Sequence, residues 1–484
     1  MIGVILVLIC ALMYYWNFRR MRKPIYDLSN KLPDVGNWSL LGHNHLFFGS
    51  PEKILKNVKE LVEQMDEAGG ISKVWIGSSF YFVSLNPEDV QKILENCLQK
   101  DDSYKFLRDW LGNGLFVAPV DLWKTQRRIL VSIFHNRIIE NYLDIFGQQG
   151  KVLVQRLNEQ AGRPEFDVYP YISSCMLDIV YETAMGEKMD VQHNPDTPYL
   201  RARSCVMSII NMRLFKAWLQ PDALFKLTPY AKLQKENIDY THKFTDEVVA
   251  KKRLEARKGK NYEGQQDLLE ILLNKDNEFS DKELREHIDS LTIAGNDTTA
   301  LVISYTLHLL GLHEDEQDKV HAELLSIFGT SDRIPTKDDL NKMECLERAI
   351  KETMRLYTVV PIIGRMTQKE IQIGSYTLPP GVGCAVIPMV MHRSKRLWGA
   401  DANSFNPDRF LPENSINRHP CAYIPFSFGA RNCIGRHFGM LAMKSVLACT
   451  LRTFKVKSKP INRFKMEILL FPIPGHLITL DKRV

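Results

Sequence analysis

One cysteine near the C-terminus carries the strongest chemical signal in the sequence. Cys433 lies in PFSFGARNCIGRHFG (residues 425–439), with Gly429, Arg431 and Gly435 at fixed spacings around it. A cysteine binds metal as the thiolate, and an anionic sulfur needs N–H donors nearby. Glycines let the backbone approach the sulfur, and a helix that begins just after the motif directs its N-terminal dipole toward it. The motif therefore predicts that Cys433 is a thiolate ligand of a metal.

Zinc and haem iron are both possible metals for this cysteine, and the spacing of the neighbouring residues distinguishes between them. His419 and Cys421 precede Cys433, and His437 follows it, so zinc is one alternative. Structural zinc sites usually have tighter pairs such as C-x-x-C, which the sequence lacks. The complete pattern F-x-x-G-x-R-x-C-x-G favours haem iron, because a thiolate ligand promotes O–O cleavage and an arginine can pair with a haem propionate. A free buried cysteine in a loop is the remaining alternative.

With this motif the chain resembles the cytochromes P450, over about residues 30–484. AGNDTT (294–299) resembles the oxygen-activating motif of that family. The resemblance implies that Asp297 and Thr298 deliver protons during catalysis. A solvated polar patch is the alternative, but apolar residues flank the motif on both sides.

Two further motifs resemble a structural network of the family. KETMRL supplies Glu352 and Arg355, and FNPDRF (405–410) supplies Arg409. By themselves, Glu352 and Arg355 would fit a surface ion pair, because positions i and i+3 share a helix face. With Arg409, the resemblance implies a buried Glu-Arg-Arg network that supports the haem fold.

The resemblance also implies residues that contact the haem. Trp123 and Arg127 form the W-x-x-x-R pattern of a propionate contact, but Gln126 stands where the family often has histidine. That departure puts one propionate contact in doubt. The full set of implied cofactor-binding residues is Trp123, Arg127, Arg365, Arg431, Phe426 and Gly435.

A helical segment, LDIVYETAMG (177–186), resembles the microsomal family-4 group and suggests an insect-type member. Many members of that group carry a glutamate that can form an ester with haem. Here that position is Ala294, so the resemblance implies non-covalently bound haem b.

The N-terminus has the composition of a membrane anchor. Residues 1–18 contain no charge, and at about 1.5 Å per residue they just span a bilayer core. Basic residues follow at once, which predicts a cytosolic body on the endoplasmic reticulum membrane. A cleaved signal peptide is the alternative, but the chain lacks the usual leading basic residues and cleavage site. We therefore expect an anchor (1–18), a basic and Pro/Gly linker (19–45) and one catalytic domain (46–484).

The periodicity predicts a mainly α fold with a smaller β portion. Residues 71–86 read as a hairpin, 125–330 as mostly helical, and 371–382 as a hairpin with a Pro-Pro-Gly turn. A final helix is expected after Gly435. The resemblance implies a P450 fold, with haem between the long oxygen-activating helix and this final helix.

Charge and cysteine usage narrow the function classes. The segment 1–31 carries +4 of the net charge of +6, so the body offers no basic surface typical of nucleic-acid binding. The nine cysteines are scattered without a C-x-x-C pair, which indicates a reduced, cytosol-facing protein.

The resemblance implies a haem-thiolate monooxygenase that acts on an apolar substrate with dioxygen. No flavin or nicotinamide motif is present, so electrons from NADPH require a separate flavoprotein reductase, and cytochrome b5 is a second candidate partner. Docking candidates are Lys124, Arg128 and Arg436. Candidate pocket residues, each equally compatible with ordinary core, are Phe106, Ala294, Ile362, Ile363, Leu470 and Phe471.

Three alternatives stay open at this point. The apolar, lysine-bearing stretch 214–229 fits either a membrane contact or plain helix packing. A haem-thiolate isomerase or dehydratase would keep the fold and need no reductase. Such enzymes can dispense with proton delivery, so the intact Asp297–Thr298 pair argues against this alternative. A non-catalytic haem-binding sensor is the third alternative.

Overall fold

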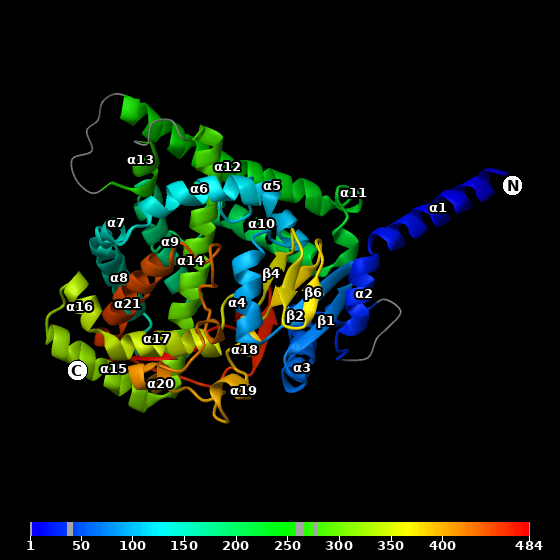
Figure 1. The fold of residues 1–484 in the computed structure, drawn as a ribbon. Helices are drawn as coiled ribbons and strands as arrows, with labels where there is room; N and C mark the ends of the chain where they lie inside the picture. The colour runs from blue at the N-terminus through cyan, green and yellow to red at the C-terminus, as the bar shows by residue number, and fades with distance from the viewer. Residues whose placement is uncertain (1, 36–41, 258–265, 274–278, 484) are drawn as a thin grey trace.

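One long helix, α14 (Asp281–Leu312), crosses the centre of the molecule, and other helices pack around it (Figure 1). The computed structural model describes residues 2–35, 42–257, 266–273 and 279–483. Helix α14 begins at a capping box in which Ser280 and Glu283 each accept a hydrogen bond from the other's backbone N–H. Most of its residues from Thr299 to Leu310 are buried, as expected for a helix covered on all sides.

The helices surround this central element, and small sheets lie to one side, which confirms the predicted fold class (Figure 1). The remaining helices, in chain order, are α1 (Ile2–Met21), α2 (Lys23–Lys31), α3 (Pro51–Glu67), α4 (Pro87–Asn96), α5 (Arg108–Leu111), α6 (Val120–Ile133), α7 (Asn136–Glu140), α8 (Leu143–Asn158), α9 (Tyr169–Met185), α10 (Pro198–Phe215), α11 (Asp222–Phe225), α12 (Pro229–Arg257), α13 (Leu268–Leu273), α15 (Glu314–Phe328), α16 (Lys337–Lys342), α17 (Glu344–Leu356), α18 (Pro388–Met391), α19 (Lys395–Trp398), α20 (Pro412–Ser415) and α21 (Arg436–Thr453).

Four small sheets make up the β portion. The largest has the strand order β1-β2-β7-β4, and the others are β3-β11-β8, β9-β10 and β5-β6. The strands are β1 (Ile71–Ile76), β2 (Ser79–Ser84), β3 (Phe166–Asp167), β4 (Ile363–Met366), β5 (Ile371–Ile373), β6 (Tyr376–Leu378), β7 (Gly383–Val386), β8 (Phe454–Ser458), β9 (Arg463–Met466), β10 (Leu470–Ile473) and β11 (Leu477–Lys482).

The structure confirms one predicted hairpin and corrects the turn of another. Strands β1 and β2 pair antiparallel around Gly77 and Ser78, as the sequence predicts. Strands β5 and β6 also pair, but their turn is Gly374-Ser375, and the Pro-Pro-Gly segment follows β6. Gly374 has φ of 54°, and a two-residue turn with positive φ matches strand twist better than the proline pair does.

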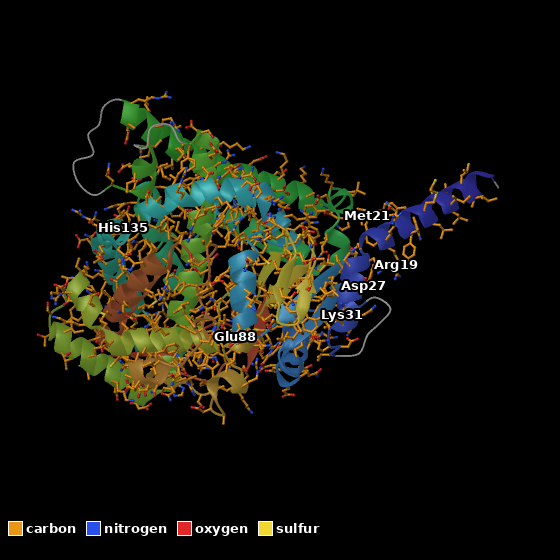
Figure 2. All side chains as sticks on the ribbon, viewed as in Figure 1. Arg19, Met21, Asp27, Lys31, Glu88 and His135 are labelled. Carbon is orange, nitrogen blue, oxygen red and sulfur yellow. The ribbon has the colours of Figure 1, made fainter. Side chains whose placement is uncertain are left out.

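The N-terminal helix α1 projects from the body, and Figure 2 shows Arg19 and Met21 near the junction. The segment after it was predicted as a linker (19–45), but its first part is helical: α2 packs on the main sheet. Trp75 Nε1 donates to Ser29 Oγ at 3.1 Å, and Lys73 Nζ donates to the Ser29 carbonyl at 2.7 Å. The predicted irregular stretch at 36–41 lies outside the described residues.

Candidate functional site

The Cys433 loop folds back on itself before α21 begins. The Cys433 N–H donates to the Phe426 carbonyl at 2.9 Å, and the Asn432 N–H donates to the Gly429 carbonyl at 3.1 Å. Gly429 needs its glycine, because its φ is 73° and a Cβ there would lie 2.7 Å from the Leu94 carbonyl oxygen. The loop therefore holds Cys433 one turn ahead of a long helix, as the motif predicts.

The Cys433 side chain combines surface exposure with dense surroundings. It is exposed, yet the surrounding protein is dense enough that burial raises the pKa of the thiol. The Gly435 N–H donates to the sulfur, and the cations of Arg127 and Arg436 also act to lower the pKa. The sulfur thus has a hydrogen-bond donor and nearby positive charges, which stabilise the thiolate form that binds a metal.

A cluster of cations lies beside this loop. It consists of Arg365 and Arg431, both buried, with Lys100 and Arg127, and we call it the cation cluster. Burial, together with the nearby charges of Arg365 and Arg127, lowers the pKa of Arg431 to about 9. Burial, followed by Arg365 and Arg431, holds the pKa of Lys100 well below its ordinary value. Four cations kept this close together require an anion.

The hydrogen bonds of the cation cluster leave room for that anion. Arg431 Nη2 donates to the Ala118 carbonyl at 2.7 Å, but its Nε and Nη1 are buried without a protein partner among the described residues. Arg365 Nη1 donates to the Gly364 carbonyl at 2.9 Å, and its Nε is likewise without a partner. Trp123 packs over the Arg431 guanidinium at 4.2 Å and fixes its orientation. These unpaired donors fit the two carboxylates of a haem next to Cys433.

Gln126 and Arg127 of α6 both make hydrogen bonds within the protein. Gln126 is buried and donates to the Asn113 carbonyl at 3.1 Å, so it braces the loop before α6. Arg127 Nη2 donates to Asn432 Oδ1 at 2.8 Å, which ties α6 to the cysteine loop. Lys100 was absent from the sequence prediction, since no motif marks it and only the fold brings it to Arg365 and Arg431.

The Asp-Thr pair of α14 sits in two different environments. Thr298 Oγ1 donates to the Ala294 carbonyl at 2.6 Å, and Ala294 is exposed between the half-buried Ile293 and Gly295. Asp297 Oδ2 accepts from Arg203 Nη2 of α10 at 2.7 Å. Tyr169 Oη of α9 lies 3.4 Å from Asp297 Oδ1. Arg203 was also absent from the sequence prediction, because it lies far from the motif in sequence.

The structure brings Glu352, Arg355 and Arg409 together. Arg355 Nε and Nη2 each donate to one carboxylate oxygen of Glu352 at 2.7 Å, and Arg409 Nε lies 3.4 Å from Glu352 Oε1. Glu352 and Arg355 are completely buried, which excludes the surface ion pair. Arg355 also donates to backbone carbonyls at 392, 402 and 404, so the network fixes this segment against α17.

The candidate pocket residues differ in exposure. Phe106, Ile363 and Leu470 are buried, and the Phe106 ring packs under the Arg213 guanidinium at 4.7 Å. Ile362 and Phe471 are partly buried, and only Ala294 of the set is exposed. Ala294, Ile362 and Phe471 are therefore the members of this set with surface left for a ligand.

The histidines near the cysteine loop do not gather into a zinc site. His419 Nδ1 accepts from the Cys421 N–H at 3.1 Å, and His437 lies 3.9 Å from Glu140. Among the described residues, no group of three or more His, Cys, Asp or Glu side chains could hold a metal ion. Cys433 therefore has no protein co-ligands in the described part of the chain, as a single axial ligand of haem requires.

A cysteine just ahead of a helix N-terminus, beside a cation cluster with unpaired donors, fits a haem-thiolate site. The sequence model of the family Cytochrome P450 matches residues 33–480. The chain belongs to the cytochrome P450 family and is a haem-thiolate monooxygenase with haem iron.

Relatives agree with the predicted family-4 resemblance. Cytochrome P450 4c3 of Drosophila melanogaster is 34% identical over 511 aligned positions that cover 100% of this chain and 94% of that protein. Cytochrome P450 4V2 of Homo sapiens is 33% identical over 473 positions, covering 93% and 90%. The crystal structure of the cytochrome P450DA heme domain has a TM-score of 0.82 at 23% identity and covers 94% of this chain and 98% of that one, which shows the shared fold.

Proposed function

We propose that this monooxygenase inserts one atom of dioxygen into an apolar organic substrate and releases the other as water. The substrate classes are fatty acids, hormones, semiochemicals and xenobiotics, and the electrons come from NADPH through a separate flavoprotein reductase. The cation cluster beside the helix-capped Cys433 carries the proposal, because it fits a dianionic cofactor and an axial thiolate at one place.

In this proposal each residue of the site has one role towards the haem. Cys433 would supply the thiolate ligand of the haem iron, while Gly435 and Phe426 shape its loop. The residues that would hold the propionates are Trp123, Arg127, Arg365, Arg431 and Lys100. When bound, the haem supplies the redox chemistry of oxygen activation. Ala294 offers no carboxylate for an ester, so the haem b is held non-covalently.

Asp297 and Thr298 move protons toward the oxygen-binding side. Thr298 is anchored by its bond to the Ala294 carbonyl, and Asp297 is oriented by Arg203. The substrate lies against the exposed face at Ala294, with Ile362 and Phe471 as further lining. Phe106, Ile363 and Leu470 support that lining from behind, because they are buried.

The protein is anchored by α1 in the endoplasmic reticulum membrane with its body in the cytosol. Gly3–Met21 is long and apolar enough to cross a membrane by length and composition. Three apolar side chains around the short α11 segment are exposed: Trp218 before it, Leu224 within it and Leu227 after it. In the view of Figure 1, α11 lies at the end of the body from which α1 projects, so we infer that the same membrane would meet this face. That placement favours the membrane contact over plain packing for the stretch 214–229.

The reductase docks on the side of the cysteine loop that bears Lys124, Arg128 and Arg436, which are all exposed, and cytochrome b5 would use the same basic face. An isomerase would need no proton delivery, and a sensor would need no reductase. The Asp297–Arg203 pair, which orients a carboxylate beside Thr298, favours the monooxygenase over both.

The first experiment is the carbon monoxide difference spectrum of the reduced protein, beside Cys433→Ala. A strongly red-shifted Soret band in the parent, lost in the variant, supports thiolate ligation at Cys433. A haem-loaded parent without that band would refute the site. NADPH-dependent oxygen consumption with a flavoprotein reductase then separates a monooxygenase from an isomerase or a sensor.

A further inference from the structure

Asp297 is one end of a series of buried polar side chains that spans four helices. Its partner Arg203 lies on α10, and Tyr199 lies four residues earlier on the same face of that helix. Tyr181 of α9 meets the Tyr199 ring edge-to-face at 5.8 Å, and both tyrosines are close enough to Arg203 to act on its pKa. The Tyr181 hydroxyl is buried and has no hydrogen-bond partner among the described residues. The series therefore extends from Asp297 to Tyr199.

Asp289 extends the series along α14. It lies two turns before Asp297, so the two carboxylates share a face of the helix. The Asp289 charge acts on Tyr199, and Thr245 Oγ1 of α12 donates to Asp289 Oδ1 at 2.7 Å. The other oxygen, Oδ2, is buried and has no hydrogen-bond partner among the described residues. A buried polar atom of this kind is usually satisfied by water.

The far end of the series meets the protein surface. His242 Nε2 contacts the Trp110 carbonyl oxygen at 2.7 Å and lies 3.9 Å from Asp289 Oδ2, which is too far for a direct hydrogen bond. His242 also lines a surface groove of about 480 Å³. The other lining residues are Asp239, Lys243, Asp246, Glu247, Ala250 and Arg285.

Asp289 is suited to exchange protons near neutral pH. Burial raises the pKa of its carboxyl to about 7, while the Thr245 hydroxyl and Arg285 act to lower it. The charges of Asp246 and Glu286 contribute to this rise in the Asp289 pKa. The remaining ionisable groups that face it are His242, whose pKa burial lowers, and Tyr199, whose pKa burial raises to about 12.

We propose that Asp289 is the proton-entry residue of this enzyme, passing protons from the surface groove to Asp297 through the Tyr199 and Tyr181 hydroxyls and intervening water. This inference rests on the proposed function. The Asp289 carboxyl releases one proton toward Asp297 and takes one back from water in the groove, so its own charge is restored in each cycle. Arg203 stays charged throughout and is a positioning residue for Asp297.

The test compares Asp289→Asn with Glu286→Gln. Glu286 is a buried carboxylate on the same helix that accepts the Asn113 N–H at 3.0 Å and lies outside the series, so it is a matched control. The full-length, haem-loaded protein is assayed with NADPH, a flavoprotein reductase and dodecanoate as the probe. NADPH oxidation, oxygen consumption and hydrogen peroxide release are recorded on both sides of about pH 7.

For Asp289→Asn we expect NADPH oxidation to fall by about tenfold. We also expect a larger share of oxygen to leave as peroxide, and the pH dependence near neutrality to disappear. Glu286→Gln should keep the parent's rate and peroxide share. Because it removes one of the charges that raise the Asp289 pKa, it should keep a pH dependence that is displaced to lower pH. An infrared band of a protonated carboxyl that titrates near neutral pH in the parent, and is missing only from Asp289→Asn, would support the assignment without turnover.

A second variant separates failure of this inference from failure of the proposed function. If Thr298→Ala raises the peroxide share while Asp289→Asn behaves like the parent, the entry route is refuted and the monooxygenase function stands. If the parent itself consumes no oxygen with NADPH and reductase, the proposed function fails, and the proton route fails with it.

Discussion

Replacing Arg355 by alanine should remove a large part of the stability of the fold. Its guanidinium makes two bonds of 2.7 Å to Glu352 and further bonds to the carbonyls of His392, Ala402 and Ser404 at 2.8, 2.6 and 3.1 Å. Both charged side chains have 0% exposure, so solvent cannot replace any of these contacts. The variant would leave a carboxylate and three carbonyl groups short of donors.

The size of the effect follows from these contacts. Breaking a buried ion pair by removing one partner costs about 3–5 kcal/mol. Glu352 would keep its contacts with the Asn406 N–H at 2.9 Å and with Arg409 at 3.4 Å, but the three carbonyls would lose their donor. We therefore expect the free energy of unfolding to fall by about 5 kcal/mol. A domain has about 5–15 kcal/mol in total, so this loss is a third or more of it. Glu352→Gln should cost less, about 2–3 kcal/mol, because Arg355 would still serve the three carbonyls.

The assay is urea unfolding of the full chain, followed by far-ultraviolet circular dichroism. Arg463→Ala is the control, because Arg463 makes the same two-bond contact to Glu52, at 2.7 Å each, on the exposed surface. Its midpoint should stay near that of the parent. An Arg355→Ala midpoint equal to the parent's, or a Glu352→Gln loss larger than the Arg355→Ala loss, would refute the reasoning.

Three further predictions concern the site. Cys433→Ala should keep the fold but lose the red-shifted carbon monoxide band, as read by difference spectroscopy; an unchanged band would place the ligand elsewhere. Lys100→Met should make the haem-free protein melt at a higher temperature, because repulsion with Arg365 and Arg431 is relieved. It should also release haem about tenfold faster to apomyoglobin; slower release would contradict a propionate contact. The pKa of Asp289 is about 7 in the folded protein and 3.8 ordinarily, so the folded state holds this proton more tightly than the unfolded state does. The free energy of unfolding should therefore fall by about 4 kcal/mol as the pH rises from 3.8 to 7. Asp289→Asn removes this pH-dependent loss of stability, so the urea midpoint of the variant should rise relative to that of the parent between pH 5 and pH 8. A difference in midpoint that stays constant with pH would show that the pKa of Asp289 is not raised.

The sequence alone determined the local chemistry of the protein. The Cys433 motif works through neighbouring backbone groups, so the loop and the start of α21 follow from a few consecutive residues. The β1–β2 hairpin and the apolar α1 are also local, since strand alternation and an uncharged run need no distant partner. Glu352 and Arg355 were predicted as a pair because they lie one helical turn apart.

Tertiary structure decided the contacts between segments that are far apart in the sequence. Lys100 reaches Arg365 and Arg431 only because the segment after α4 lies against β4, and Arg203 reaches Asp297 only because α10 crosses α14. Strand pairing also decided the position of the β5–β6 turn, which is Gly374-Ser375 and not the Pro-Pro-Gly segment that the sequence predicted. Burial and charge pairing depend on distances in space, so these contacts cannot be predicted from the positions of the residues in the sequence. A motif can therefore name the reacting groups, but only the packed fold decides which charges surround them.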